Sequence, residues 1–133
     1  MTQKEPITSD QAPAPVGPFS QAILSGDFVF VSGQVGLDPA SGALGDTIEA
    51  QTRQTLQNVG ALLSQAGCNF GDVVKSSCFI TDAANFAAFN AVYREFFPLP
   101  FPARSTIICG LALEGLLVEI DVIARRPAAA SGG

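Results

Sequence analysis

The stretch Pro98–Ala124, PLPFPARSTIICGLALEGLLVEIDVIA, decides the fold because it holds two apolar runs of strand-forming residues and a turn between them. Three prolines lead into Arg104, and proline fixes φ and removes backbone donors, so the chain enters the first run stiff and extended. The LEG sequence at 113–115 predicts a turn, after which the second run, with Glu119 and Asp121, is expected to hairpin back. A fixed cation beside a carboxylate suits the binding of a small acid.

The composition bounds the class of protein. With 133 residues, 47% hydrophobic and 14% charged, the chain suits one domain over residues 1–133 with one core. Its few charged side chains favour self-association, because apolar faces need covering. A net charge of -5 argues against a nucleic-acid partner, whose phosphates need clustered Lys and Arg. No apolar run is long enough to predict a membrane span.

The reactive side chains are few. The sequence has no histidine, which removes the commonest general base and metal ligand, so no metal site is expected. The glycines form no nucleotide-binding fingerprint, and no cofactor is expected. Three cysteines without a CxxC spacing imply neither a disulfide framework nor a zinc ribbon. Because the N-terminus also lacks a secretory signal, a cytoplasmic location is expected.

Hydrophobic periodicity predicts the order β-β-α-β-α-β-β. Asp46 is the expected N-cap of the first helix, with Glu49 as its capping-box partner. The expected elements are an extended arm (1–18), strands at 19–24 and 28–31, a helix at 46–66 stopped by Gly67, a strand at 72–80, a helix from 81 closed by Pro98, the two strands of the opening stretch, and a flexible tail (125–133).

This order predicts an α+β fold, with one mixed sheet and two helices on one face. The strand at 28–31 is apolar at every position, so both of its faces are expected to be buried. Since no further helix is available to cover the second sheet face, oligomerisation through the sheet is expected.

Arg104 and Glu119 each allow two interpretations. Arg104 is either an arginine that reaches solvent or pairs structurally, or a bidentate clamp for a carboxylate. Glu119 and Asp121 share one strand face, which is either a solvated acidic face or the wall of a cleft where Glu119 orients water. The pattern alone favours the structural interpretation of both residues.

Three other polar residues are also open to two interpretations. Ser32 at a strand end satisfies local backbone groups or faces a ligand, and Gly33 beside it lets the backbone bend or approach one. Asn90, within the second helix, points outward or turns into a pocket. Tyr93 is expected in the core or in an interface.

Several motifs together resemble one known family, the Rid (YjgF) family of reactive enamine/imine deaminases. They are APVGPFSQA at 14–22, VSGQ at 31–34, QTLQN at 54–58, FNAVY at 89–93, PARS at 102–105 and VEI at 118–120, and the likeness runs from about Ala12 to Ala124. The resemblance implies a chorismate-mutase-like homotrimer with helices outside, sheets forming a central barrel, and active clefts between subunits.

The resemblance also implies a reaction and a site. The reaction is cofactor-free hydrolysis of 2-aminoacrylate and 2-imino acids to 2-keto acids and ammonia. Arg104 would hold the substrate carboxylate and Glu119 would position water. The cleft would be lined by Phe19, Ser32, Gly33, Asn90 and the backbone at Thr106.

Two positions depart from the family pattern. Phe19 stands where Tyr is common among members with demonstrated imine hydrolysis, and Thr106 where Cys is frequent. These changes leave open a dedicated deaminase of a larger, aminomuconate-like acid. A non-enzymatic trimer that binds a small ligand or a partner is a further alternative.

Overall fold

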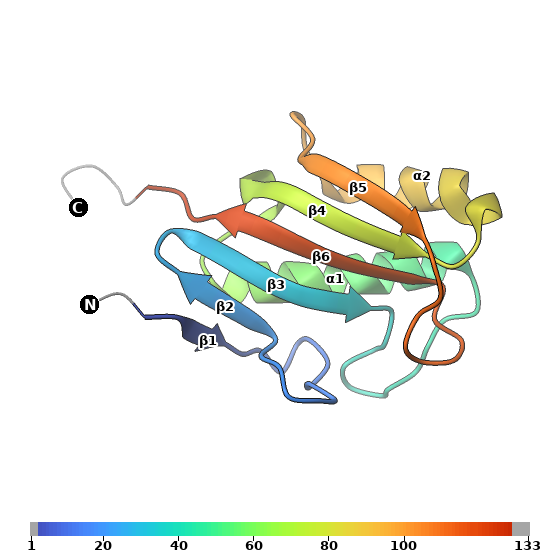
Figure 1. The fold of residues 1–133 in the computed structure, drawn as a ribbon, viewed down its shortest axis with the longest axis horizontal. Helices are drawn as coiled ribbons and strands as arrows, with labels where there is room; N and C mark the ends of the chain where they lie inside the picture. Colours follow the sequence, from blue (N-terminus) through green and yellow to red (C-terminus); the bar gives the residue numbers. More distant parts are fainter. Residues whose placement is uncertain (1–2, 129–133) are drawn as a thin grey trace.

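The computed structural model describes residues 3–128 and has a six-stranded sheet with both helices on one face (Figure 1). The expected α+β architecture is confirmed. In chain order the elements are β1 (Glu5–Ile7), β2 (Ala22–Ser25), β3 (Phe28–Val35), α1 (Ile48–Gln65), β4 (Val73–Ile80), α2 (Phe86–Phe96), β5 (Ala103–Ile108) and β6 (Val118–Arg125), with single 3₁₀ turns at Phe70–Asp72 and Ala83–Asn85.

The strand order is β1-β2-β3-β6-β4-β5. The expected hairpin between the two strands of the opening stretch is therefore wrong. β5 runs parallel to β4, whereas β6 lies between β3 and β4 and is antiparallel to both (Figure 1). Because β6 is central, both of its edges are hydrogen-bonded to neighbouring strands, and β6 is also the strand richest in buried apolar residues. The shorter β5 lies at the edge of the sheet.

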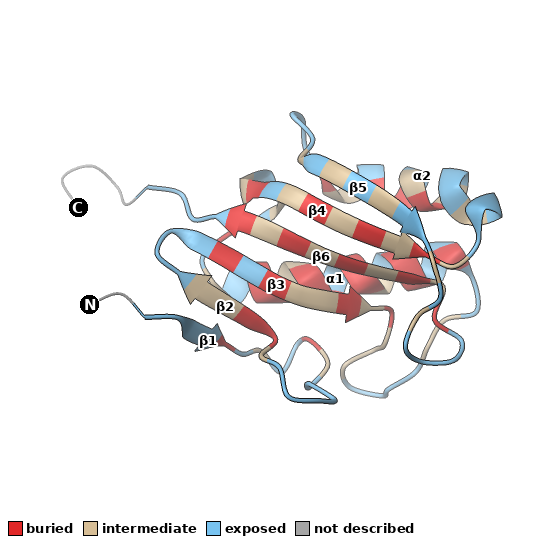
Figure 2. Cartoon of the chain, in the orientation of Figure 1, coloured by how far each residue is buried: buried red, intermediate tan, exposed pale blue. Residues whose placement is uncertain are grey.

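Side chains of β6 alternate between the two faces of the sheet (Figure 2). Val118, Ile120 and Val122 are buried in the core, which α1 completes with residues such as Leu56 and Leu62. Glu119, Asp121 and Ile123 lie half-buried on the opposite face, so the prediction that the two acids share a face is confirmed.

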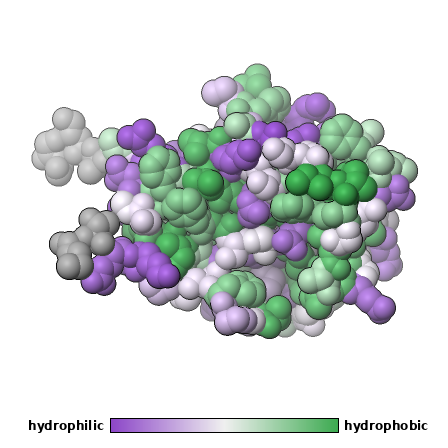
Figure 3. Space-filling model, viewed as in Figure 1, coloured by the Kyte–Doolittle hydropathy of each residue, from purple (hydrophilic) through white to green (hydrophobic). Residues whose placement is uncertain are grey.

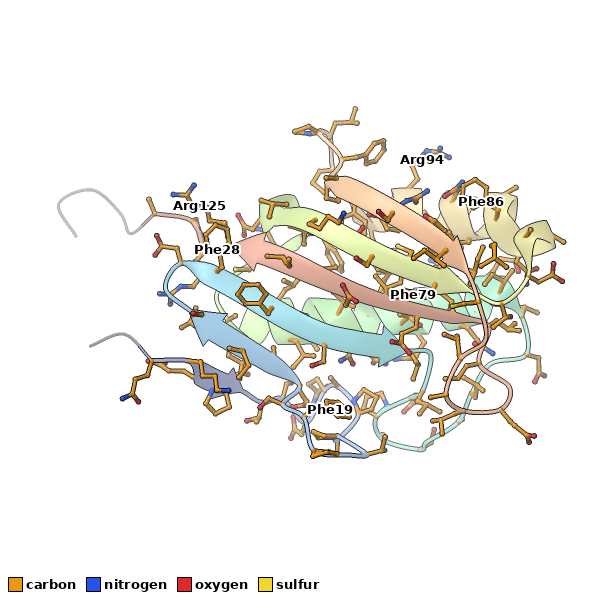
Figure 4. The ribbon with its side chains drawn as sticks, in the orientation of Figure 1. Phe19, Phe28, Phe79, Phe86, Arg94 and Arg125 are labelled. Carbon is orange, nitrogen blue, oxygen red and sulfur yellow. The ribbon has the colours of Figure 1, made fainter. Side chains whose placement is uncertain are left out.

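That opposite face, called the open face below, carries apolar side chains in the single chain (Figure 3). Phe28, Phe30 and Ile107 are 40%, 43% and 48% exposed. Phe28 and Phe79 stand on the side of the sheet away from the helices (Figure 4). β3 is thus buried on one face only within the chain, and the expected burial of its second face would need another molecule.

Both chain ends contain more structure than expected. Residues 5–7 form β1, which pairs with β2, so the arm is not without structure of its own. Arg125, expected in the tail, belongs to β6, and the backbone N–H of Arg126 donates to the Asp27 carbonyl at 2.7 Å. Residues 129–133 of the expected tail lie outside the described residues.

The helix ends differ slightly from expectation. Thr47, not Asp46, is the N-cap of α1, and its Oγ1 accepts from the Ala50 N–H at 3.1 Å. Gly67 follows the C-cap with φ of 80°, a conformation that favours glycine, as predicted. Asp82 caps the 3₁₀ turn at 83–85, and α2 begins only at Phe86. Neither helix of the described chain is both long and apolar enough to span a bilayer.

Candidate functional site

Glu119 lines a cavity of about 370 Å³ at one end of the sheet. Its walls come from the N-terminal arm, the end of β3 and the connection between β5 and β6. Four of the residues expected at the site line this cavity: Phe19, Ser32, Gly33 and Glu119. The arm therefore contributes to the wall, a point that the sequence left open.

A register shift in β3 brings the backbone against Glu119. The pairing of β3 with β6 is irregular between Val31 and Gln34. Such β-bulges are over-represented next to active sites. A methyl group on Gly33 would lie 2.9 Å from the carboxyl carbon of Glu119. Ser32 is fixed by its Oγ, which donates to the Ser20 carbonyl at 2.6 Å. Ser32 therefore has the local role that its strand-end position suggested, while Gly33 makes room for the carboxylate.

Gly33→Ala is expected to displace the Glu119 carboxylate. A reaction that uses this carboxylate should then slow at least tenfold, since misplacing a reacting group by about 1 Å costs on that order or more. The measurement is kcat/KM for a 2-imino acid, the substrate class that the resemblance implies. Gly110→Ala is the matched control, because no atom lies within 4 Å of its added methyl and its φ is not positive. Equal activity of the two variants would contradict the role of Gly33.

The electrostatic environment of Glu119 favours its neutral form. Burial raises the pKa of Glu119, and the nearby Asp121 carboxylate raises it further. Burial also raises the pKa of Asp121, partly offset by a hydrogen bond from Ser77 and by the charge of Lys75. A carboxyl whose pKa moves towards neutrality is a better proton acceptor when ionised.

Arg104 lies in a second cavity, of about 270 Å³, between α2 and the loop before β5. Its guanidinium carbon is 4.8 Å from the centroid of the Tyr93 ring and 5.5 Å from that of Phe89. Tyr93 is itself buried, as expected, and shares a 2.7 Å hydrogen bond with Ser76. Among residues 3–128, Arg104 has no carboxylate partner, since the ion pair there joins Arg53 and Glu95.

Two unsatisfied oxygens accompany Arg104. Asn90 lines the same cavity, and its Oδ1 is buried without a hydrogen-bond partner. Asn90 therefore turns into a pocket rather than outward. Thr106, two residues beyond Arg104 on β5, has a buried Oγ1 that also lacks a partner. Buried polar groups without partners are uncommon in folded proteins and are frequent where a ligand completes the site.

Cys78 is the cysteine nearest to this cluster, in register with Thr106. Burial raises the pKa of its thiol to about 11. The thiol is thus protonated at neutral pH and is a poor nucleophile. Within the described chain no group of three Cys, Asp or Glu side chains is placed to hold a metal ion.

Arg104 and Glu119 lie on opposite faces of the sheet. On β4, Ser76 is in register with Arg104 and Phe79 with Glu119, and residues an odd number apart on a strand face opposite sides. β4 also separates the two strands. One chain therefore divides the expected site into two halves: Glu119 with Phe19, Ser32 and Gly33, and Arg104 with Asn90 and Thr106.

Sequence reasoning missed two groups around these halves. The Tyr93–Ser76 pair beneath Arg104 is formed across elements, and no local pattern reports it. Gln21, Gln51 and Asn58 are buried carboxamides that hydrogen-bond to the backbone of loops near the Glu119 cavity. The glutamine at position 51 lies within an apolar helical pattern, and this could have indicated that the Gln51 side chain is buried.

The sequence is similar to a known family and to named proteins. Residues 9–126 match the family described as Endoribonuclease L-PSP. A goat protein named 2-iminobutanoate/2-iminopropanoate deaminase is 42% identical over 120 residues, covering 89% of this chain and 87% of its own. A Salmonella typhimurium protein of the same name is 40% identical over 123 residues, covering 90% and 96%.

The fold is shared with solved structures. The crystal structure of E. coli TdcF with bound serine superposes with a TM-score of 0.88 at 34% identity, covering 92% of this chain and 99% of that one. A protein of the Rid family from Yersinia pestis, YyfA, gives a TM-score of 0.88 at 42% identity, with the same coverage of 92% and 99%. Relatives named as imine deaminases support deamination of the Rid type. The chain belongs to the endoribonuclease L-PSP family, the YjgF and Rid proteins, as its motifs indicated.

Proposed function

We propose that this chain is a cofactor-free deaminase that hydrolyses 2-aminoacrylate-type enamines and 2-imino acids to 2-keto acids and ammonia. The observation that carries the proposal is Arg104, a half-buried cation without a carboxylate partner in the described chain, near the oxygens of Asn90 and Thr106 that are unsatisfied there. A 2-imino acid offers a carboxylate to the guanidinium and an N–H donor to such oxygens. The names of relatives about 40% identical to the chain agree with this chemistry.

The two half-sites would meet between subunits of a homotrimer. The apolar open face supports such an assembly, because Phe28, Phe30 and Ile107 would be covered in it. Each cleft would then combine Arg104 of one copy with Glu119 of the next. Fixing the substrate carboxylate and presenting a water supplies orientation worth several kcal/mol.

The proposed steps balance without a metal or a redox group. Ionised Glu119 accepts a proton from water while the water oxygen bonds to the electrophilic imine carbon. The C=N π electrons move to nitrogen, which takes the proton that Glu119 had accepted, so a carbinolamine forms and Glu119 is ionised again. Glu119 then accepts the proton of the carbinolamine hydroxyl and passes it to the nitrogen. C=O forms as the C–N bond breaks, ammonia leaves, and Glu119 returns to its ionised state. Enamines enter after tautomerisation to the imine.

The test generates 2-iminopropanoate from alanine with an amino-acid oxidase and traps residual imine with semicarbazide. Active protein is expected to reduce semicarbazone formation in proportion to its concentration. Undiminished semicarbazone at micromolar protein would overturn the proposal. The readout reports imine lifetime directly and does not depend on the cellular role, which we place in cytoplasmic control of damaging metabolites.

A larger acid is the second candidate substrate, supported by the volume of the Glu119 cavity, about 370 Å³, and by Phe19 on its wall. An aminomuconate-like acid would bind its carboxylate on Arg104 and extend along the apolar wall. A higher kcat/KM for such an acid than for 2-iminopropanoate would favour this candidate. A nucleic-acid substrate fits poorly, because the chain has 7 basic and 12 acidic residues.

A further inference from the structure

We propose that Gln21 is a positioning residue: it fastens the arm segment Ser9–Pro13, which leads into the wall of the Glu119 cavity at Pro13, and thereby sets which substrate side chains the cavity admits. The effect of Gln21 on substrate selectivity rests on the proposed deaminase function, whereas the fastening of the arm does not.

The side chain of Gln21 is 4% exposed and bonds to the arm through both ends of its carboxamide. Oε1 accepts from the Ser9 N–H at 2.9 Å. Nε2 lies 3.0 Å, 3.2 Å and 2.9 Å from the carbonyl oxygens of Ser9, Ala12 and Pro13, so its two hydrogens serve three acceptors. Only a group with a donor and an acceptor on one carbon satisfies this arrangement.

The hydrogen bonds that hold segment Ser9–Pro13 to the rest of the fold come from this one side chain. Pairing of β1 with β2 ends at Ile7. Within the part of the chain that the structure describes, no other side chain from outside the arm hydrogen-bonds to Ser9–Pro13. Ala12 is buried in the core, but its side chain is a single methyl group. Loops with few contacts open at low free-energy cost, so the bonds of Gln21 are the main polar attachment of this segment.

The segment that Gln21 holds faces the cavity. Pro13 and Ala14 line it, and Val16 and Phe19 continue the same apolar wall, with Leu113 contributed by the connection between β5 and β6. Phe19 lies at the lower edge of the molecule in Figure 4.

The backbone of Gln21 links the wall to the reacting end of the site. Its carbonyl accepts from the Ser32 N–H at 3.0 Å, and Gly33, the next residue, packs against Glu119. The side chain thus places the wall at a fixed distance from the carboxylate. Because the wall is apolar and offers no charged group, it is suited to the side chain of a 2-imino acid rather than to its carboxylate or nitrogen.

Gln21→Glu tests the proposal with an almost isosteric change. An ionised carboxylate has no donor for the three carbonyls, so the arm is expected to detach at neutral pH. The introduced carboxylate still accepts from the Ser9 N–H, so the Ala12 amide, which bonds to the Ser9 carbonyl within the segment, is the probe. Hydrogen exchange of the Ala12 amide should accelerate at least tenfold. Burial would raise the pKa of the introduced acid, so acidification should protonate it, restore one donor and slow exchange again relative to the intrinsic rate. Gln11→Glu is the matched control, since the side chain of that exposed arm glutamine bonds to its neighbour Asp10.

The activity readout compares two imines, one derived from alanine and one from leucine. In Gln21→Glu, KM for the leucine-derived imine is expected to rise about tenfold, the scale set by lost apolar contact. KM for the alanine-derived imine, whose methyl group makes less contact with the wall, is expected to rise less, so the ratio of the two KM values is the readout. A merely destabilised fold would not separate the two substrates, and Val59→Ala, a buried change on α1, provides that comparison.

The outcomes separate the two proposals. Unchanged Ala12 exchange in Gln21→Glu overturns the fastening role. Faster exchange with an unchanged substrate ratio overturns the selectivity role. If wild-type protein hydrolyses no imine, the proposed function and the selectivity role fall together, while exchange still tests the fastening. If Gln21→Glu does not fold, Gln21→Met supplies the same readouts, with the three carbonyls again left without a donor.

Discussion

Arg104→Ala is expected to lower kcat/KM for 2-iminopropanoate about 10³-fold, because truncating one partner of a desolvated charge pair costs roughly 2–5 kcal/mol. The guanidinium is held over Tyr93 and pairs with no carboxylate among residues 3–128, so the interaction that is lost is the one with the substrate carboxylate. Arg104→Lys should recover only part of the activity, since an ammonium cannot make the paired contacts of the planar fork. Steady-state kinetics with the semicarbazide assay provides the measurement.

The control for charge is Arg53→Ala. Arg53 is an exposed arginine whose 2.8 Å bond to Glu95 joins α1 to α2, so its loss removes one positive charge outside both cavities. Activity is expected to stay within twofold, because exposed ion pairs contribute little. Arg104→Ala protein with wild-type activity and a lowered Tm would instead show that Arg104 only stabilises the stack on Tyr93.

Glu119→Gln is expected to lower kcat by 10²–10⁴-fold with little change in KM, the usual range for a lost proton acceptor. The amide keeps the size of the side chain but cannot take a proton from water. In the wild type, kcat should fall as pH decreases through the raised pKa of Glu119, because protonation removes the acceptor. Asp121→Asn should move this acidic limb to lower pH, since it removes one of the causes of the raised pKa.

Mixing the two inactive proteins tests where the halves of the site meet. If the protein forms the proposed trimer, Arg104→Ala and Glu119→Gln subunits that are unfolded and refolded together should form some clefts with an intact Arg104 and an intact Glu119. The mixture is expected to be far more active than either protein refolded alone. An inactive mixture with the light-scattering mass of a trimer would contradict a cleft shared between neighbours.

The sequence predicted those parts of the fold that depend on local pattern. The periodicity of residues 48–65 and the glycine at position 67 located α1, and alternation on β6 placed Glu119 beside Asp121. β1 was missed because three residues, one of them proline, give too short a pattern. Thr47 displaced Asp46 as the N-cap because both are good caps and only the backbone decides between them.

Strand pairings and contacts between residues distant in sequence could not be predicted from local pattern. A turn at 113–115 between two apolar runs favours a hairpin, but pairing is decided by which edges remain free once the whole sheet forms. The same limit applies to the site. Motifs identified Arg104 and Glu119, whereas only the register of β4 reveals that their side chains point to opposite faces.

The central place of β6 has a consequence for biosynthesis. Until Val118–Arg125 has left the ribosome, β3 and β4 have no strand between them, so the N-terminal three strands and the β4–β5 pair remain separate pieces. Pairings that span most of the chain close late and slowly. The nascent chain therefore exposes the facing edges of β3 and β4 until β6 emerges, which makes those edges natural targets for holding chaperones.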